Sequence, residues 1–218
     1  TIEDAMVFME EINSDLSGQM ELEYEGYFPR GLFVAVKGSN KGAKKKYALL
    51  REDGTTKITG FETIRRNWSS LAKEAQEHVL ELVLGDKPDE AVEYVKDVIK
   101  DLKEGKIPAS KLILRTQITR ELSKYDSIGP HVLVAMKLAQ QGERIVPGTV
   151  IEYIIVEGPG IIRERARIPS QVGDGEYDAD YYLNHQLMPA VSSIFLVLGY
   201  KEDEIFSETK QTGLGSFF

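Results

Sequence analysis

Acidic side chains with a regular spacing occur near the start of the 218-residue chain. In the stretch MELEYEGY, every second residue from Glu21 to Glu25 is a glutamate. Alternate residues of an extended strand share one face, so Glu21, Glu23 and Glu25 would form a row of carboxylates, with Met20, Leu22 and Tyr24 on the other face. Such a row is either a solvated strand face or a face turned toward a metal-dependent site. Both interpretations stay open at this point.

Basic side chains dominate the next stretch, KGSNKGAKKKYALL. It holds five lysines within ten residues and no acidic residue, at Lys37, Lys41, Lys44, Lys45 and Lys46. Clustered lysines beside an aromatic side chain, here Tyr47, suit a nucleic-acid backbone, because each neutralised phosphate releases counterions. A solvated lysine-rich turn is an equally common alternative. Two glycines and a Ser-Asn pair predict that this stretch forms a hairpin tip.

The elements that would position these residues follow from the hydrophobic spacing. Ile2, Met6, Met9, Ile12 and Leu16 recur every three or four residues, which predicts an amphipathic helix that ends near Gly18. A strand over residues 20–25 and a partner strand over residues 30–36 would then form a hairpin. The N-terminal part is therefore expected to be a helix followed by a β-hairpin.

Beyond residue 60 the spacing is mostly helical. Apolar residues from Ile64 to Leu82 predict one long helix that ends near Gly85, and Arg65 and Arg66 lie at its start. Cations oppose the helix dipole there, so a phosphate contact is one explanation for their presence. A second helix is expected from Pro88 to Gly105, with acidic residues in its first turn.

The remaining chain mixes strands and helices, which indicates an α+β fold. We predict strands over residues 110–119 and 148–158 and a short helix over residues 129–142. A helical run over residues 178–200 should break or kink near Pro189. After residue 202 the chain becomes polar and loses periodicity, which is typical of a tail.

The composition excludes several kinds of site. Of the residues, 42% are hydrophobic and 28% are charged, and no apolar run approaches the roughly 18 residues of a membrane span. The absence of cysteine excludes disulfides and thiolate metal sites, and the scattered His78, His131 and His185 argue against a histidine-built one. No Walker-type glycine loop or nucleophile elbow is present. We expect a soluble, cytoplasmic protein without a membrane partner.

Six stretches, in order, resemble the C-terminal part of archaeal family B DNA polymerases. They are ELEYEGYFPRGLF, KKKYALL, GFETIRRNWSSLAKE, QITRELSKYDSIGPHVLVAMKLA, PGTVIEYIIVEG and YDADYYLNHQLMPAV. The resemblance covers nearly the whole chain. It implies that residues 1–40 form the end of a palm, that residues 41–202 form a mostly helical thumb with short strands, and that residues 203–218 form a flexible tail.

The catalytic centre of the family lies mostly outside the resemblance. The Asp-x-x-Ser-Leu-Tyr-Pro, Lys-x-x-x-Asn-Ser-x-Tyr-Gly and Tyr-x-Asp-Thr-Asp segments of family B enzymes are absent from this sequence. The resemblance implies that Glu25 lies near the Mg²⁺ site as a catalytic and metal-site carboxylate, with Glu23 in support. We expect a small subunit of a polymerase encoded in two pieces, inactive without a large catalytic subunit that binds most of the Mg²⁺.

The same resemblance assigns DNA-binding residues. Lys44, Lys45 and Tyr47 carry over as groups that hold the primer-template duplex, where the minor-groove acceptors are the same for A·T and T·A pairs. Arg65 and Arg66 would continue this grip along the backbone. The chain would thus position DNA and complete the palm, and its partner would supply the metal-binding aspartates.

The last eight residues, QTGLGSFF, match the sliding-clamp-binding pattern Gln-x-x-Leu-x-x-Phe-Phe. The pattern places Gln211, Leu214, Phe217 and Phe218 on the clamp, proliferating cell nuclear antigen. Two alternatives remain: a non-enzymatic DNA-binding or clamp-binding adaptor, and a structural scaffold. The glutamate strand and the Lys-Lys-x-Tyr segment count against the adaptor, and the lysines beside a clamp tail count against the scaffold.

Overall fold

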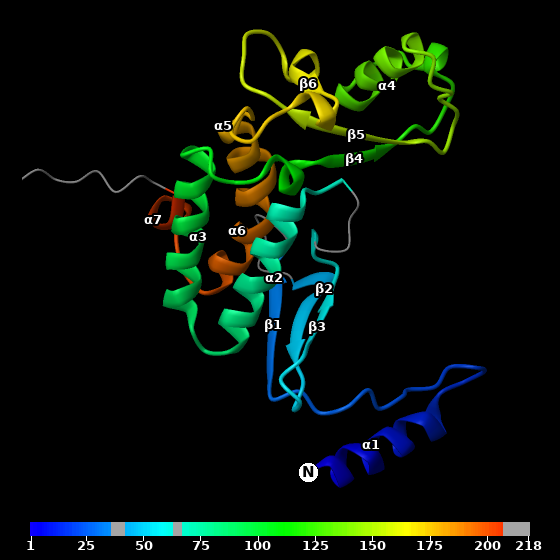
Figure 1. Cartoon of the computed structure of the whole chain (residues 1–218). Coiled ribbons are helices and arrows are strands. Elements are labelled where there is room, and N and C mark those ends of the chain that lie inside the picture. Colours follow the sequence, from blue (N-terminus) through cyan, green and yellow to red (C-terminus); the bar gives the residue numbers. More distant parts are fainter. Residues whose placement is uncertain (36–41, 63–66, 207–218) are drawn as a thin grey trace, which may run out of the picture.

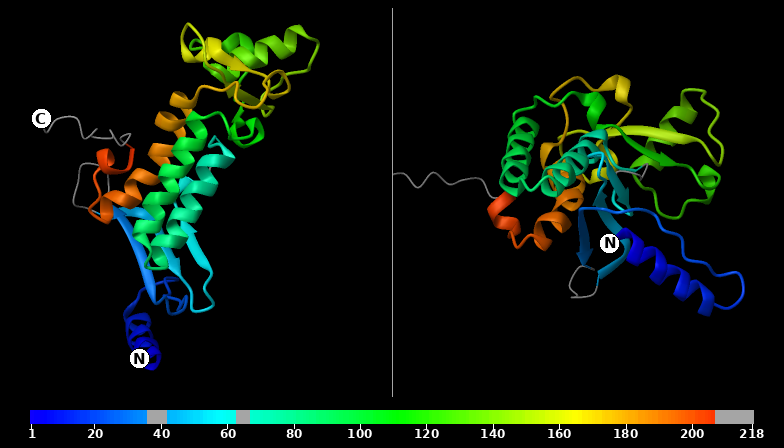
Figure 2. Two further views of the ribbon diagram at one scale, coloured as in Figure 1. Left: turned by 60° about the vertical axis from the view of Figure 1, so that its left-hand side comes forward. Right: turned by 90° about the horizontal axis from the view of Figure 1, so that it is seen from below.

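The computed structural model describes residues 1–35, 42–62 and 67–206, and shows an elongated molecule (Figure 1). A three-stranded sheet with its covering helices forms the middle, helix α1 lies at one end, and a second three-stranded sheet lies at the other, as both figures show (Figure 2). The expected α+β class is confirmed. Within the described ranges, no helix is both long and apolar enough to cross a membrane. The predicted roles of Lys37, Lys41, Arg65, Arg66 and residues 211–218 concern positions outside these ranges.

Helix α1, Ile2–Asp15, confirms the first predicted helix. It begins with a capping box, in which the Thr1 hydroxyl accepts the Asp4 backbone N–H and the Asp4 carboxylate accepts from Thr1. None of its residues is buried, and it stands apart from the central sheet (Figure 1). No described residue of α1 therefore belongs to the hydrophobic core.

The strand predicted over residues 20–25 is wrong. Residues 20–28 form no strand, and Met20 and Tyr27 are more than half exposed. Two side-chain contacts are recorded for this stretch. Asn13 accepts from the Leu22 N–H at 2.7 Å and donates to the Leu22 carbonyl at 3.0 Å, and the Lys57 ammonium of β3 pairs with the Glu25 carboxylate. A strand needs a ladder partner, and residues 20–28 pair with neither β1 nor β3, the two edge strands of the central sheet.

The central sheet is antiparallel, in the order β1–β2–β3. Its strands are β1 Arg30–Ala35, β2 Gly42–Leu50 and β3 Thr56–Thr59. The strand expected over residues 30–36 is thus confirmed, but its partner is β2, and the described part of the lysine-rich stretch forms this strand. Leu32, Val34 and Ala48 face the core, whereas Phe33 and Tyr47, paired across the strands, face outward. Strands on both sides of residue 40, the predicted palm boundary, share this sheet.

Three helices cover the inner face of the sheet or pack on one another there: α2 Ser70–Leu84, α3 Pro88–Lys103 and α6 Met188–Val197. Helix α3 agrees closely with its prediction. Helix α2 ends before Gly85 as predicted, but it begins later than expected, and Trp68 precedes it. The reason is the Ser69 hydroxyl, which accepts the Ala72 N–H and so fixes the N-terminus of the helix.

The outer sheet has the order β4–β5–β6 and carries helix α4, Pro130–Gln140, which confirms the predicted short helix. Its strands are β4 Leu114–Gln117, β5 Val150–Ile155 and β6 Ala166–Arg167. Short 3₁₀ turns connect these elements: η2 Ala109–Leu112, η3 Leu122–Lys124, η4 Ile162–Arg165 and η5 Pro169–Gln171. The strand predicted from residue 110 starts later, at Leu114, because the residues before it form the 3₁₀ turn η2.

The last helical run breaks before Pro189, as predicted. Helix α5, Ala179–Tyr182, continues into the π-helical η6, Leu183–Leu187, and then into α6. The widened turn accommodates a proline that cannot donate a backbone hydrogen bond. A final helix, α7 Glu202–Phe206, follows, and its Ile205 is buried. The first residues of the expected tail are therefore helical, and α7 packs against α3 and α6.

Candidate nucleic-acid interface

The lysines of strand β2 lie on a bulge. Phe33 pairs with Tyr47, and the next recorded pair is Ala35 with Gly42, so β1 advances two residues while β2 advances five. Extra residues in one strand bend it and turn its side chains away from the regular alternation. Lys45, within the bulge, has a φ of 59°, in the left-handed region. The ladder therefore does not fix the direction of these lysines.

Gly60 packs directly against the bulge. Its φ is +73°, and a Cβ at this position would lie 1.9 Å from the Lys45 carbonyl oxygen and 2.9 Å from the Lys45 carbonyl carbon. Only glycine allows such an approach of two backbones. The chain after β3 thus presses on the bulge from one side and supports the unusual conformation of Lys45.

The three consecutive lysines do not point the same way. Lys44 and Lys45 are exposed, whereas the Lys46 side chain is only 21% exposed. The Lys46 ammonium donates to the Glu62 carboxylate oxygens at 3.2 and 3.3 Å, and lies 5.0 Å from the centre of the buried Phe61 ring. Two lysines of the cluster are therefore available to a ligand, and the third is engaged inside the protein.

Two aromatic rings lie beside the outward lysines. The rings of Phe33 and Tyr47 are 5.8 Å apart between centres, on the outer face of the sheet, and Phe33 is 65% exposed. We call Lys44, Lys45, Tyr47 and Phe33 together the lysine–aromatic patch. Cations next to exposed rings match the requirements of nucleic-acid binding, in which cations bind phosphates and rings contact sugars or bases.

Glu25 lies on the same outer face of the sheet. Its carboxylate accepts from the ammonium of Lys57, a residue of β3 whose side chain is mostly covered, while the Glu25 side chain is 63% exposed. Lys57 and Tyr47 share this face. Lys57 pairs with Leu49, and Leu49 lies two residues after Tyr47 in β2, so their side chains point to the same side of the sheet. The structure thus brings the predicted catalytic carboxylate and the predicted DNA-binding tyrosine onto one surface.

The predicted row of three glutamates is not formed, because the segment is not a strand. Glu21 and Glu23 are exposed and have no recorded partner on the sheet. Within the described residues, no three carboxylate or histidine side chains are close enough to hold a metal ion together. Of the three predicted carboxylates, only Glu25 has a recorded contact with the sheet, through Lys57.

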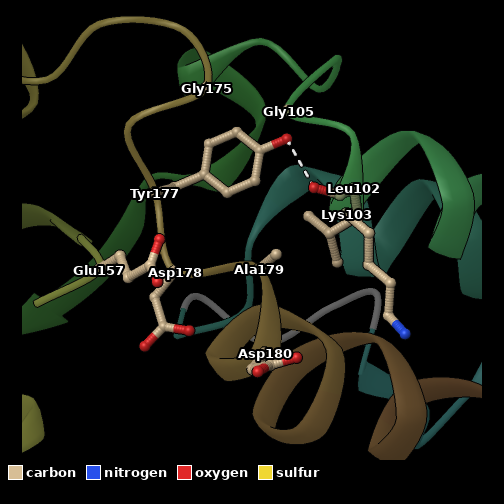
Figure 3. Close-up of a pocket in the computed structure, with 9 residues that line it drawn as sticks. All are labelled: Leu102, Lys103, Gly105, Glu157, Gly175, Tyr177, Asp178, Ala179 and Asp180. Carbon is tan, nitrogen blue, oxygen red and sulfur yellow. Dashed lines mark hydrogen bonds between the residues drawn. The ribbon is translucent and has the colours of Figure 1, made fainter.

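A pocket of about 340 Å³ lies elsewhere, between the end of α3 and the start of α5 (Figure 3). The Tyr177 hydroxyl donates to the Leu102 carbonyl at 3.1 Å, and burial raises the pKa of this tyrosine. Asp178 accepts the Tyr181 N–H at 2.8 Å and pairs with Arg165. Since its most buried carboxylate already caps a helix and binds an arginine, the pocket joins structural elements and contains none of the predicted site residues.

The comparisons with known proteins identify the family. The family model described as DNA polymerase family B matches residues 2–198. This chain belongs to the family B DNA polymerases. It is 46% identical over 219 residues to a DNA polymerase of Thermococcus sp. (strain 9oN-7), a match that covers 98% of this chain and 27% of that protein. A DNA polymerase of Methanocaldococcus jannaschii is 43% identical over 218 residues, which cover 100% of this chain and 13% of that protein.

A solved structure of this family shares the fold. The structure of the family B DNA polymerase from the hyperthermophilic archaeon Pyrobaculum calidifontis matches with a TM-score of 0.71 and 35% identity, over 91% of this chain and 25% of that one. The chain thus spans only about an eighth to a quarter of the length of such polymerases. The resemblance inferred from the sequence is confirmed at the level of the family.

Two residues of this interface were missed by the sequence analysis. Phe33 lies between Leu32 and Val34 in a stretch that alternates, so the outward position of an aromatic residue was visible in the pattern. Glu62 gave no such signal, because its contact with Lys46 depends on the bulge. The division of the lysine cluster into outward and inward members could not be predicted from spacing.

Proposed function

We propose that this chain is the small, C-terminal subunit of a DNA-directed DNA polymerase of family B, and that it holds the primer-template duplex. The lysine–aromatic patch is the observation that carries this proposal, because two exposed lysines closely precede Tyr47, whose ring pairs with that of Phe33, in a family B chain. Lysines bind backbone phosphates irrespective of sequence, as a polymerase requires.

The duplex is held from two sides in this proposal. Lys44 and Lys45 bind phosphates, and Tyr47 lies against the minor groove, whose acceptors do not distinguish A·T from T·A. Arg65 and Arg66, outside the described residues, extend the grip along the backbone. The predicted division into palm end, thumb and tail, at residues 40 and 202, belongs to the same proposal.

The large catalytic subunit is the partner of the N-terminal part. Helix α1 exposes Met6, Val7 and Phe8, and the following segment exposes Met20 and Tyr27, with exposed fractions between 36% and 63%. Large apolar side chains exposed in this number within one segment indicate an interface. Because the chain spans only part of its relatives' length, we assign this surface to the palm of the catalytic subunit.

Catalysis belongs to the assembled enzyme. Mg²⁺, bound mainly by the catalytic subunit, would stabilise the charge that develops during phosphoryl transfer. Glu25 would support that site from the outer face of the sheet, with Glu23 further away, and Lys57 keeps the Glu25 carboxylate on this face. The clamp-binding peptide of Gln211, Leu214, Phe217 and Phe218 would tether the complex to the sliding clamp.

The test is duplex binding and primer extension by the complex of this chain with its catalytic subunit. Lys45→Ala and Tyr47→Ala should each weaken primer-template binding by about 1–3 kcal/mol, since each removes an interface contact, while nucleotide affinity changes less. Lys96→Ala, on an exposed face of α3, is the matched control and should bind normally.

Two outcomes would contradict the proposal. Unaltered duplex affinity of both variants at moderate salt would remove the duplex-holding role. Duplex binding by the isolated chain that is as tight as binding by the complex, with no stimulation of primer extension, would instead favour a DNA-binding or clamp-binding adaptor. The comparison of chain and complex therefore separates the two functions.

A further inference from the structure

A chain of polar side chains lies behind the lysine–aromatic patch. Lys46 donates to both oxygens of Glu62, which is 8% exposed. The Gln76 side-chain amide, fully buried, donates to a Glu62 oxygen at 2.7 Å and also to the Ala190 carbonyl. These contacts join the bulge of β2 to helices α2 and α6, so we call Lys46, Glu62 and Gln76 the polar anchor.

The polar anchor replaces the backbone ladder where the ladder is interrupted. The recorded pairs of β2 with β1 stop at Tyr47 and resume only at Gly42, and those with β3 begin at Tyr47. The direction of Lys44 and Lys45 therefore depends on contacts other than strand pairing. Lys46 follows them directly in the chain, and its side chain is held inside the protein.

A purely stabilising role would not require charges at this position. Burying an ion pair carries a desolvation penalty, and apolar residues of similar volume often give equal or greater stability. A hydrogen-bonded carboxylate does, however, fix direction, since it accepts only along defined lines. We therefore expect the polar anchor to add little to the free energy of unfolding and to orient the bulge instead.

We propose that Glu62 and Gln76 are positioning residues for duplex binding. They hold Lys46 inward, and by doing so they direct Lys44 and Lys45 of the lysine–aromatic patch toward the DNA backbone. This inference rests on the proposed function of the patch. It also assigns Lys46, the third lysine of the cluster, to the interior and not to a phosphate.

A neighbouring contact supports this role. The Ser69 backbone N–H donates to the Gln186 side-chain oxygen at 2.9 Å, and both residues are buried. Gln186 belongs to the π-helical η6, next to the helix whose Ala190 carbonyl binds Gln76. Glu62 and Ser69, which flank residues 63–66, are therefore both fixed to the same helical run.

The opposite hypothesis makes Lys46 a phosphate ligand that Glu62 sequesters. The two hypotheses predict changes of opposite sign for Glu62→Gln in the complex with the catalytic subunit. If Glu62 positions the bulge, the dissociation constant for primer-template duplex should rise about tenfold, or 1.4 kcal/mol. If Glu62 sequesters Lys46, the variant should bind the duplex more tightly, which would overturn the proposal.

The salt dependence of binding identifies the mechanism. A lost phosphate contact reduces the slope of log K against log salt by about 0.9, so Lys45→Ala should show this reduction. Glu62→Gln should leave the slope unchanged and raise the KM for duplex while kcat at saturating duplex stays near that of the wild type. Glu74→Gln is the matched control. Glu74 lies on α2, as Gln76 does, and this substitution breaks an exposed ion pair with Lys111.

Lys46→Met provides a second arm that does not depend on the carboxylate. It keeps the length of the side chain, and we expect the same rise in the dissociation constant with an unchanged slope. A slope reduced by about 0.9 would show that Lys46 binds phosphate and would overturn the proposal. If Lys45→Ala itself has no effect, the proposed function fails. If Lys45→Ala weakens binding and both anchor variants bind normally, only this inference fails.

Discussion

Replacement of Gly60 by alanine should damage the structure far more than the small change in size indicates. The new Cβ would lie 1.9 Å from the Lys45 carbonyl oxygen, a backbone atom that no side-chain rotation can move away. The φ of +73° adds a second penalty, because residues with a Cβ avoid the left-handed region. Both effects act on the bulge that carries the lysines.

A matched glycine separates the two effects. Gly54, in the β2–β3 turn, has a φ of +83°, and a Cβ there would meet nothing within 4 Å. Gly54→Ala should therefore lower the free energy of unfolding only by the cost of the left-handed conformation, about 1–2 kcal/mol. Gly60→Ala should lower it by the same amount plus about 1–3 kcal/mol for the backbone shift that relieves the overlap.

Thermal unfolding measures the difference. For a chain of this size, 1 kcal/mol corresponds to about 2–4 °C in Tm. We expect a fall of about 2–8 °C for Gly54→Ala and about 4–20 °C for Gly60→Ala, with the two variants compared at equal concentration. Gly60→Ala should also weaken duplex binding by the complex, because Lys45 must move. Equal Tm values and equal duplex affinities for the two variants would refute the reasoning.

Three further predictions concern other parts of the chain. Tyr182→Phe removes the hydroxyl that accepts the buried Ile155 N–H at 3.1 Å. It should lower the free energy of unfolding by about 1–3 kcal/mol in a denaturant titration, and an unchanged unfolding midpoint would contradict this. Glu25→Gln in the complex should reduce turnover and leave duplex affinity nearly intact, and normal turnover across magnesium concentrations would return Glu25 to a solvated surface role. Deletion of residues 211–218 should preserve synthesis on short primers and reduce clamp-stimulated synthesis on long templates, and equal stimulation would exclude this clamp-binding role for the tail.

Local signals predicted some elements well. Helix α3 has proline in its first turn, acidic residues after it, and a glycine with a φ of 72° just beyond its end, so the sequence defines both ends. Helix α1 likewise follows from spacing and an N-terminal cap. These features act within a few residues and do not depend on the rest of the fold.

Other elements depend on distant partners. Residues 20–25 alternate as a strand would, yet they form no ladder with β1 or β3, the edge strands of the described sheet. The start of α2 was misplaced because the apolar spacing continues through Trp68, whereas the Ser69 hydroxyl fixes the helix start. Alternation and periodicity report the tendency of one segment on its own. Strand pairing and helix capping then determine whether that segment forms the element and where it begins.

The candidate site was predictable in composition and not in orientation. Lysines next to Tyr47 predicted phosphate binding, and Lys44 and Lys45 are exposed in the structure. The inward turn of Lys46 arises from a bulge, from Gly60 and from a carboxylate sixteen residues away. No regular spacing of residue types in the sequence predicts such a set of contacts.

The exposure of helix α1 has a consequence for the amounts of the two chains in the proposed assembly. A helix of 14 residues with no buried side chain is only marginally stable in water, so its helical population should depend on the concentration of whatever covers its apolar face. In the proposed assembly, chains made in excess of the catalytic subunit would keep Phe8 and Met20 in contact with solvent and would tend to associate with one another. Balanced synthesis of the two subunits would then protect solubility as well as activity.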